Sequence, residues 1–360
     1  MKKYKVCVYA ICKNEEKFVD RWVESMKEAD GIYVLDTGST DNTVKKLKKL
    51  GVNVSKKIIK PWRFDVARNE SIKLIPEDCD ICVCTDLDEV FKPGWRKELE
   101  KCWKNNTTRL RYIYNWSLDE FDNPIISFYY EKIHARHGFK WVLPVHEILE
   151  YDGEEIYSIS DNIILNHYPD SKKSRSSYLP LLELSIKENP NNDRTMHYLG
   201  REYMYYHRYN DAIDTLIKHI NMESATWKDE RCASMRFIGR CYKMLNRFNE
   251  SRMWFQLAIK EAPYLRDPYV EMALLEYQLG NYSKVIFYCQ EALQIKSHTK
   301  SYINEPFSWD HTIYDLISIA YFYKNDYEQS LLYIKKAIEI SPNNKRLLNN
   351  LKLIKEANEN

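Results

Sequence analysis

Three acidic side chains, Asp86, Asp88 and Glu89, follow an apolar run at residues 80–85. Carboxylates at the end of a buried strand are costly unless a cation neutralises them. In an extended segment, Asp86 and Asp88 point to the same side. One or two carboxylates, completed by substrate phosphates, are a usual way of binding a divalent ion. We therefore predict a cation site here, and the alternative is an acidic cluster at the start of a helix.

Two more polar motifs follow the first two apolar runs of the chain: CKNEE at residues 12–16 and LDTGSTDNT at residues 35–43. A carboxylate at a strand's end, such as Asp36, can accept hydrogen bonds from a ribose or a base edge, and Gly38 lets the backbone turn sharply toward a ligand. Ser39 and Asp41 are also good caps for a helix that begins at Thr43. The second motif alone therefore fits a ligand-binding loop and a plain capping turn equally well.

Three later motifs carry single residues that could do chemistry: WRFDVARNE at residues 62–70, WVLPVHE at 141–147 and NHYP at 166–169. Arg68 lies near the predicted start of a helix and could reach a phosphate, although a surface arginine would look the same. His146 and His167 each fit a structural histidine or a ligand. None of these residues identifies a site by itself.

The elements that must position these motifs can be read from the hydrophobic pattern. Residues 1–95 alternate between apolar runs and segments with helical spacing, which predicts a sheet of parallel strands with helices on its faces. Ligands on such sheets bind beyond the carboxyl ends of the strands, where the first four motifs lie. Residues 107–170 are rich in β-formers and turn residues. We predict that they form antiparallel strands on the acceptor side of the same domain.

From residue 174 the pattern is helical to the end, and a repeat is visible. Units share a small residue at a predicted helix crossing and an aromatic residue after the turn: Gly200 and Tyr209, Gly239 and Phe248, Ala273 and Tyr282, Ser318 and Tyr327. The spacing resembles tetratricopeptide repeats, which have a period of about 34 residues, and an irregular helical bundle is the alternative. Such arrays form concave surfaces that bind peptides, proteins or a second copy of themselves. We predict a first domain at residues 1–173, a connecting helix at 174–193 and about four repeats at 194–360.

Taken together, the motifs resemble the family 2 glycosyltransferases of GT-A fold, over residues 4 to about 190. They occur in the order K-N-E-E, D-T-G-S-T-D-N-T, F-D-V-A-R-N, D-L-D-E-V, V-H-E and N-H-Y. Any one motif is weakly specific, but the whole set in this order is strongly specific. The resemblance is greatest to the branch with C-terminal tetratricopeptide repeats, which includes the sublancin S-glycosyltransferase. It implies an α/β nucleotide-diphospho-sugar transferase domain followed by an all-α repeat domain.

The resemblance also implies a nucleotide-sugar site. Glu15 and Asp36 should hold the uridine and ribose end of the donor, and Arg68 should lie near the nucleotide or the sugar. Lys172 and Arg175 could cover the diphosphate. The residues expected around the donor are Cys12, Asn14, Glu15, Asp36, Gly38, Ser39, Asp41, Trp62, Arg68, Asp86, Leu87, Lys172 and Arg175. UDP-glucose and UDP-N-acetylglucosamine are the donors that we expect first.

A metal-dependent, inverting mechanism is implied in the same way. Asp86 and Asp88 of the D-x-D motif, with His167, should bind Mn²⁺ or Mg²⁺ against the donor diphosphate. Asp88 is then essential for catalysis. We expect a hexosyltransferase whose acceptor is a peptide, a protein or a saccharide.

Three carboxylates are candidates for the catalytic base. Glu147 is the first candidate to take the proton from the acceptor, and Asp65 and Glu89 are weaker ones. The alternative function is a repeat scaffold that binds a nucleotide sugar without catalysis. Nucleotidyl transfer is disfavoured, because no glycine-rich, basic phosphate loop follows the first apolar run.

The bulk composition narrows the class of function. Balanced charges, 54 basic against 52 acidic residues with a formal net charge of +2, give no electrostatic argument for nucleic acid or a membrane surface as the main partner. The nine cysteines lack paired zinc-like spacing, and we expect buried, reduced thiols in a cytoplasmic protein. No stretch reaches the roughly 18 uncharged apolar residues of a membrane helix. A homodimer formed through the repeats is a further expectation.

Overall fold

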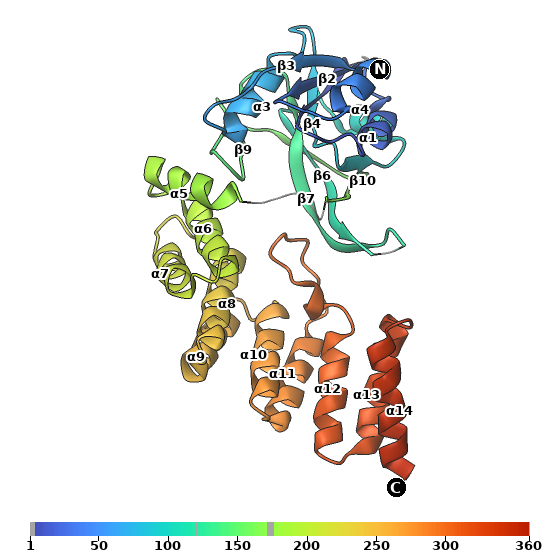
Figure 1. The fold of residues 1–360 in the computed structure, drawn as a ribbon, viewed down its shortest axis with the longest axis vertical. Helices are drawn as coiled ribbons and strands as arrows, with labels where there is room; N and C mark the ends of the chain where they lie inside the picture. The colour runs from blue at the N-terminus through green and yellow to red at the C-terminus, as the bar shows by residue number, and fades with distance from the viewer. Residues whose placement is uncertain (1–3, 120, 171–175, 360) are drawn as a thin grey trace. The chain divides into compact units, whose positions relative to one another are not determined.

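The computed structural model describes residues 4–119, 121–170 and 176–359. The chain divides into two compact units, Met1–Ser185 with Lys300–Tyr302, and Ile186–Thr299 with Ile303–Asn360 (Figure 1). The first is an α/β unit and the second is helical. The predicted order of an α/β domain followed by a helical one is therefore confirmed.

The first unit is built on a mixed sheet. Within the described residues the sheet has eight strands in the order β3-β2-β1-β4-β7-β6-β10-β5, and β8 and β9 form a separate two-stranded sheet. Its elements are β1 (Val6–Cys12), α1 (Val19–Met26), β2 (Gly31–Asp36), α2 (Thr43–Lys49), β3 (Asn53–Lys56), α3 (Phe64–Ile72), β4 (Ile81–Cys84), β5 (Glu89–Phe91), α4 (Trp95–Cys102), β6 (Arg109–Leu118), β7 (Pro124–Ala135), β8 (Phe139–Val142), β9 (Ile148–Tyr151) and β10 (Tyr157–His167).

Strand β1 organises the core because every one of its residues is buried. Val6 and Val8 point into one apolar cluster, which also contains Trp22 of α1 and Trp95 of α4. Tyr9 points to the opposite face, into a cluster that includes residues of α3, β8 and β9. A strand that is apolar on both faces is typical of a sheet covered on both sides. The sheet is therefore the middle layer of three.

The second half of the sheet differs from its prediction in one pairing. Strands β6 and β7 are antiparallel, as predicted, but β10 runs parallel to β6. The short strand β5 then pairs antiparallel with β10 and closes that edge. The prediction of purely antiparallel strands was wrong, because the connection through β7, β8 and β9 brings the chain back to start β10 at the same end as β6.

The helical unit is a series of paired helices, preceded by α5 (Tyr178–Glu188). Consecutive helices contact each other as α6 with α7, α8 with α9, α10 with α11 and α12 with α13, and α14 contacts α13. Their bounds are α6 (Asp193–Tyr205), α7 (Tyr209–Ile220), α8 (Lys228–Met244), α9 (Phe248–Glu261), α10 (Asp267–Gln278), α11 (Tyr282–Gln294), η1 (Pro306–Ser308), α12 (Thr312–Tyr323), α13 (Tyr327–Ile340) and α14 (Lys345–Glu359).

The small residues picked out by the repeat lie at helix crossings. A Cβ atom added to Gly200 would lie 2.5 Å from Cγ of Leu216, and one added to Gly239 would lie 2.5 Å from Cε1 of Phe255. Ser251 takes part in the same close packing by donating its hydroxyl to the Gly239 carbonyl at 2.8 Å. Glycine is therefore needed here for the close approach of two helices.

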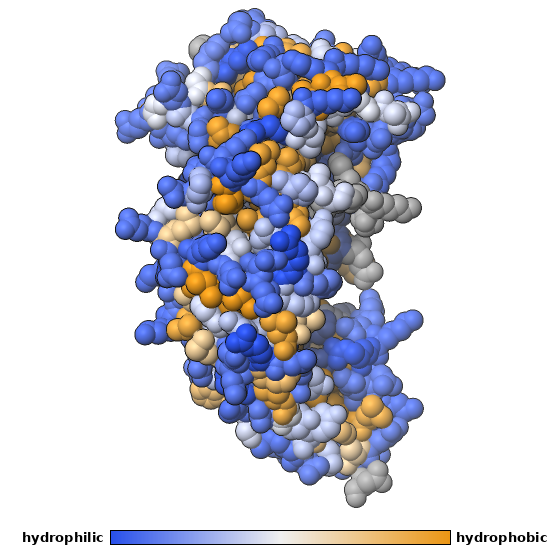
Figure 2. Space-filling view, turned by 60° about the vertical axis from the view of Figure 1, so that its left-hand side comes forward, coloured by the Kyte–Doolittle hydropathy of each residue, from blue (hydrophilic) through white to orange (hydrophobic). Residues whose placement is uncertain are grey.

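The helices, the cysteines and the surface can be compared with what the composition predicts. Among the described residues, no helix is both long enough and apolar enough to cross a membrane. All nine cysteines are free thiols, and all but Cys102 are buried. Figure 2 shows that hydrophilic residues cover most of the face in view, with apolar side chains gathered in small groups.

Candidate active site

The predicted motifs meet at one edge of the sheet. Strands β2, β1 and β4 are neighbours and run parallel, so their carboxyl ends lie side by side. In the register, Cys12 pairs with Asp36, and Tyr9 pairs with Cys84. The loops that follow these strands therefore share one crevice, the usual ligand site of such sheets.

Hydrogen bonds tie the loops after β1 and β2 together. The backbone N–H of Asn14 donates to Ser39 Oγ at 2.9 Å, and the N–H of Thr40 donates to Asn14 Oδ1 at 2.7 Å. The N–H of Glu15 donates to Thr43 Oγ1 at 2.8 Å, and the Glu15 side chain is buried. Asn14 adopts a left-handed backbone, with φ of 57°, which turns this loop toward the second one. The two motifs thus form one rigid rim.

Asp36 lies at the base of this rim and is 1% exposed. Its carboxylate accepts the N–H of Ser39 at 3.1 Å and the thiol of Cys12 at 3.7 Å. Burial, and then the charge of Asp36, raise the pKa of the Cys12 thiol, which keeps it protonated as a donor. Gly38 follows with φ of 120°, a conformation that favours glycine. The Asp36 carboxylate is thus held in place at the base of the rim.

Asp41 belongs to the capping turn. Its Oδ1 accepts the N–H of Thr43 at 3.0 Å, and its Oδ2 accepts the N–H of Glu16 at 3.2 Å. Burial opposes ionisation of Asp41, but the hydrogen bonds from Thr43 outweigh it and lower the pKa of the carboxyl. Asp41 therefore connects the start of α2 to the loop after β1.

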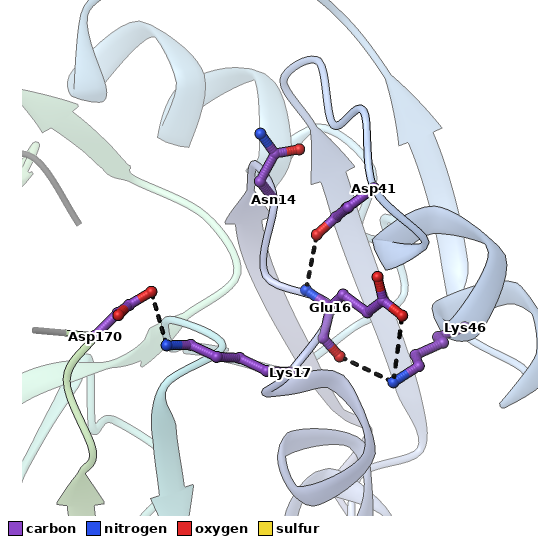
Figure 3. Close-up of a pocket in the computed structure, with 6 residues that line it drawn as sticks. All are labelled: Asn14, Glu16, Lys17, Asp41, Lys46 and Asp170. Carbon is purple, nitrogen blue, oxygen red and sulfur yellow. Dashed lines mark hydrogen bonds and ion pairs between the residues drawn. The ribbon is translucent and has the colours of Figure 1, made fainter. Parts of the chain in front are cut away.

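A polar hollow with a volume of ≈ 380 Å³ opens beside the rim (Figure 3). Its lining residues are Asn14, Glu16, Lys17, Asp41, Lys46 and Asp170. Lys17 pairs with Asp170 at 2.7 Å, and Lys46 donates to the Glu16 carbonyl at 3.2 Å. The hollow is therefore lined by charges that are already paired with one another.

The acidic turn after β4 is braced from below by Glu89. This carboxylate is 1% exposed, and it accepts the Asp86 N–H and the Tyr114 hydroxyl, each at 2.8 Å. Burial raises the pKa of Glu89. Because both of its oxygens are used inside the protein, Glu89 holds the turn rather than facing the crevice.

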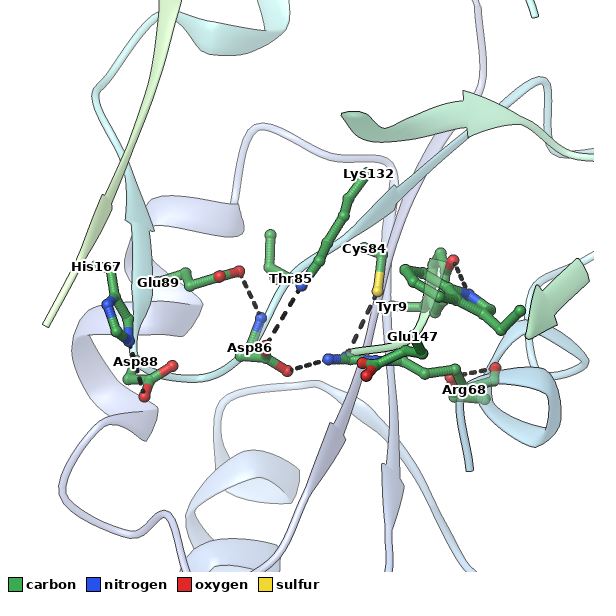
Figure 4. Close-up of polar contacts among 12 residues, drawn as sticks. Tyr9, Arg68, Cys84, Thr85, Asp86, Asp88, Glu89, Lys132, Glu147 and His167 are labelled. Atoms are coloured by element: carbon green, nitrogen blue, oxygen red, sulfur yellow. Dashed lines mark hydrogen bonds and ion pairs between the residues drawn. The ribbon is translucent and has the colours of Figure 1, made fainter. Parts of the chain in front are cut away.

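Asp88 and His167 face each other across the turn, with Oδ2 and Nε2 3.5 Å apart (Figure 4). Nδ1 of His167 lies 3.0 Å from the carbonyl oxygen of Trp116. A carbonyl can only accept, so Nδ1 donates its proton to Trp116, and in the protonated ring Nε2–H faces the Asp88 carboxylate. Burial lowers the pKa of His167, but the hydrogen bond and charge of Asp88 outweigh it and raise the value.

Asp86 lies apart from this pair. Its Oδ1 accepts from the Arg68 guanidinium at 2.7 Å, and Lys132 Nζ lies 3.5 Å from its Oδ2. Among the described residues, no group of three or more His, Cys, Asp or Glu side chains is arranged to hold a metal ion. The structure thus brings together two of the three predicted metal ligands, Asp88 and His167, and places Asp86 between two cations.

Arg68 connects the acidic turn to Glu147. It lies on α3 and is 2% exposed, and its Nε donates to Glu147 Oε1 at 3.0 Å. The loop before Glu147 is sharply bent, because Leu143 and His146 both have positive φ, 76° and 51°. The carbonyl of Pro144 accepts the N–H of Phe64, which ties this loop to the start of α3 at 2.9 Å. Two segments far apart in the sequence therefore place Glu147 beside Asp86.

The remaining predicted residues have plainer surroundings. Asp65 accepts two hydrogen bonds from Arg63, at 3.0 and 2.8 Å. The ring of Trp62 packs edge-on against Phe64, and Leu87 is buried in the core. Lys172 and Arg175 lie outside the described residues.

Lys132 is the site residue that the sequence did not reveal. It is 7% exposed on β7, and its Nζ lies 3.5 Å from Oδ2 of Asp86. In the sequence it follows FYYE as one of many lysines of the chain. Only its position beside β4, set by the pairing of Ile133 with Val83, distinguishes it.

Two family models match the chain. Residues 7–141 match the family described as Glycosyl transferase family 2, and residues 311–344 match the Tetratricopeptide repeat. The first match contains the motifs from Cys12 to Asp88, whereas Glu147 and His167 lie beyond it. No curated protein matches the chain.

Solved structures similar to parts of the chain include the following. MamA is 24% identical, with a TM-score of 0.38, over 49% of this chain and 96% of that one. The thermophilic TPR protein TTC0263 of Thermus thermophilus is 16% identical, with a TM-score of 0.38, over 50% of this chain and 89% of that one. PilF of Pseudomonas aeruginosa is 13% identical, with a TM-score of 0.38, over 49% of this chain and 72% of that one.

Proposed function

We propose that this chain, whose first unit carries a glycosyltransferase family 2 domain and whose second carries a tetratricopeptide repeat, is a metal-dependent, inverting hexosyltransferase. A domain of this family transfers a sugar from a nucleotide sugar to an acceptor. The observation that carries the finer proposal is the pair formed by Asp88, in the turn after β4, and His167, at the end of β10, with side chains 3.5 Å apart. The donor is a uridine diphosphate sugar, UDP-glucose or UDP-N-acetylglucosamine.

The donor's nucleoside binds at the rim after β1 and β2. Glu15 and Asp36 are buried carboxylates at the ends of these neighbouring strands. Fixed carboxylates suit the hydroxyls of a ribose and the N–H of a uracil, because both are donors. Cys12, Asn14, Gly38 and Ser39 shape the same rim by the hydrogen bonds and backbone turns described above.

Asp88 and His167 fit a Mn²⁺ or Mg²⁺ ion. A ligating histidine commonly donates its other ring N–H to a backbone carbonyl, as His167 does to Trp116. One carboxylate and one imidazole leave several positions for water and for the donor's phosphate oxygens, which suits these ions. When bound, the ion neutralises the charge that develops on the leaving diphosphate.

Glu147 is the base that the geometry favours. Both oxygens of Glu89 are occupied inside the protein, and Asp65 is held by two hydrogen bonds from Arg63. Glu147 is held through Oε1 by Arg68, and its side chain is 11% exposed. In the transfer, the acceptor's oxygen or sulfur forms the bond to C1, the bond from C1 to the diphosphate breaks, and Glu147 takes the acceptor's proton.

The acceptor is a peptide, a protein or a saccharide. The helical unit supports a polypeptide, because stacked repeats form extended binding surfaces. The same surface would support a homodimer. We include a cysteine thiol among the proposed acceptor groups, as in the sublancin S-glycosyltransferase branch. We also propose a cytoplasmic location.

A thermal-shift panel of nucleotide sugars with Mn²⁺ tests the proposed function. A ligand that binds only the native state stabilises it by about 2.7 kcal/mol at 100 times its dissociation constant. We expect UDP-sugars to raise the melting temperature with Mn²⁺ and to raise it much less in EDTA. If no nucleotide sugar shifts the melting temperature, the proposal is wrong.

A further inference from the structure

Lys132 is a buried lysine for which the proposed reaction has no role. Its side chain lies on β7 and is 9% exposed. Burying an ammonium group costs several kcal/mol unless it is paired. A lysine at such a position is therefore held by specific partners.

Two contacts of Lys132 involve Asp86 and Tyr130. The ammonium lies 3.5 Å from Oδ2 of Asp86 and 4.7 Å from the centre of the Tyr130 ring. Burial lowers the pKa of Lys132, but Tyr130, Glu89 and Asp86 outweigh it and raise the value. Lys132 thus has its charge paired with the Asp86 carboxylate.

The contacts of Lys132 continue into a chain of alternating charges (Figure 4). Asp86 receives Lys132 on Oδ2 and Arg68 on Oδ1, at 3.5 and 2.7 Å. Arg68 then reaches Glu147 Oε1 at 3.0 Å. The two oxygens of Asp86 are contacted by different cations, so removing either cation takes away one of the contacts that fix the carboxylate.

We propose that Lys132 is a positioning residue for sugar transfer: with Arg68 it fixes the Asp86 carboxylate, and through Arg68 it sets the place of Glu147. This inference rests on the proposed function, in which Glu147 is the base. The ion-pair partner of Lys132 is Asp86, whose other described cation, Arg68, holds Glu147. Its loss should therefore impair the chemical step more than donor binding.

The test measures UDP release from UDP-glucose with Mn²⁺ for wild type, Lys132→Met and Lys132→Arg. Methionine keeps the length of the side chain without the charge, and arginine restores the charge. Supporting residues around a catalytic group typically contribute about 10- to 100-fold in activity. We expect Lys132→Met to lose about that much kcat with KM for UDP-glucose within about 3-fold, and Lys132→Arg to recover most of the loss.

Lys140→Met is the matched control, since Lys140 is an exposed lysine on the strand β8. It should behave as wild type. If Lys132 has a purely structural role, kcat, UDP-glucose binding and the melting temperature should all fall in Lys132→Met, and Lys132→Arg should not restore them. This result would overturn the inference. If Lys132→Met keeps the kcat of the wild-type protein, the inference is wrong but the proposed function stands. If the wild-type protein neither binds nor turns over any nucleotide sugar, both are wrong.

Discussion

At the scale of single residues, the site separates its carboxylates by what each one touches. Asp88 faces His167, Asp86 lies between two cations, and Glu89 is used entirely within the protein. Glu147 shares Arg68 with Asp86. Neighbouring carboxylates can therefore have different roles, because their partners differ more than their intrinsic chemistry.

Replacing Glu147 by glutamine tests its role as the base. The amide keeps the shape and can still contact Arg68, but it cannot take a proton. We expect kcat to fall by about 10²- to 10⁴-fold while UDP-glucose binding, measured by calorimetry, is retained. Loss of donor binding would instead assign Glu147 a structural role, and Glu150→Gln, an exposed change on β9, serves as the control.

The sequence predicted these residues unevenly, for a physical reason. Asp36, Asp86 and Asp88 follow apolar runs directly, so their place at the sheet edge can be inferred from local pattern alone. Lys132 owes its role to the pairing of β7 with β4, a contact between distant segments that no local pattern encodes. Asp86 was predicted as a metal ligand from its spacing to Asp88, but spacing does not show which cations a fold brings to each carboxylate.

At the scale of elements, the local pattern was sufficient where an apolar run forms the strand, but not where the pairing of strands decides the structure. Strands β1, β2 and β4 were predicted because apolar β-forming residues make up each run. The strand β5 has three residues and forms only against β10. The parallel pairing of β10 with β6 depends on the course of the whole connection between them. Pairing direction is thus a tertiary property here.

The helix crossings make a direct prediction about stability. Gly239→Ala would place a Cβ atom against the ring of Phe255, which is fully buried and has little room to move. Overpacking of this kind typically costs about 1–3 kcal/mol. We expect urea denaturation to show that loss. Lys260→Ala changes an exposed residue on the partner helix α9, and its free energy of unfolding should stay within about 0.5 kcal/mol of wild type. An equal loss of stability in both variants would contradict the packing argument.

Helix α6 carries a buried histidine that should make stability depend on pH. Burial lowers the pKa of His197 from 6.5 to about 3 in the folded protein. Above pH 6.5 His197 is neutral in both states; as the pH falls toward 3, the unfolded chain binds a proton that the native state does not. The unfolding free energy should therefore fall with acidification, by up to about 1.4 kcal/mol per pH unit from this group.

Denaturation of His197→Phe at pH 6 and at pH 4 checks this expectation. The variant should lose less stability between the two pH values than wild type does. His137→Asn, a change at an exposed histidine, should keep the wild-type dependence. If His197→Phe and wild type show the same slope, His197 does not contribute to it.

At the scale of the whole molecule, the chain joins a unit that carries the chemistry to a unit of repeated helices. Every residue of the candidate active site lies in the first unit. Only that unit should be stabilised when UDP and Mn²⁺ bind, by about 2.7 kcal/mol at 100 times the dissociation constant. Scanning calorimetry should show one transition that moves with ligand and one that does not. If only the transition of the helical unit moves, the nucleotide binds there, and the assignment of the site to the first unit is wrong.

The most direct test of the central claim is a calorimetric titration of UDP into wild type and Asp88→Asn, each with Mn²⁺ and with EDTA. If Asp88 and His167 hold a cation against the donor's diphosphate, wild type binds UDP at least about 10-fold more tightly with Mn²⁺, and Asp88→Asn loses that gain. Equal UDP affinity of wild type with Mn²⁺ and with EDTA would contradict the account, as would a Mn²⁺-dependent gain that survives in Asp88→Asn.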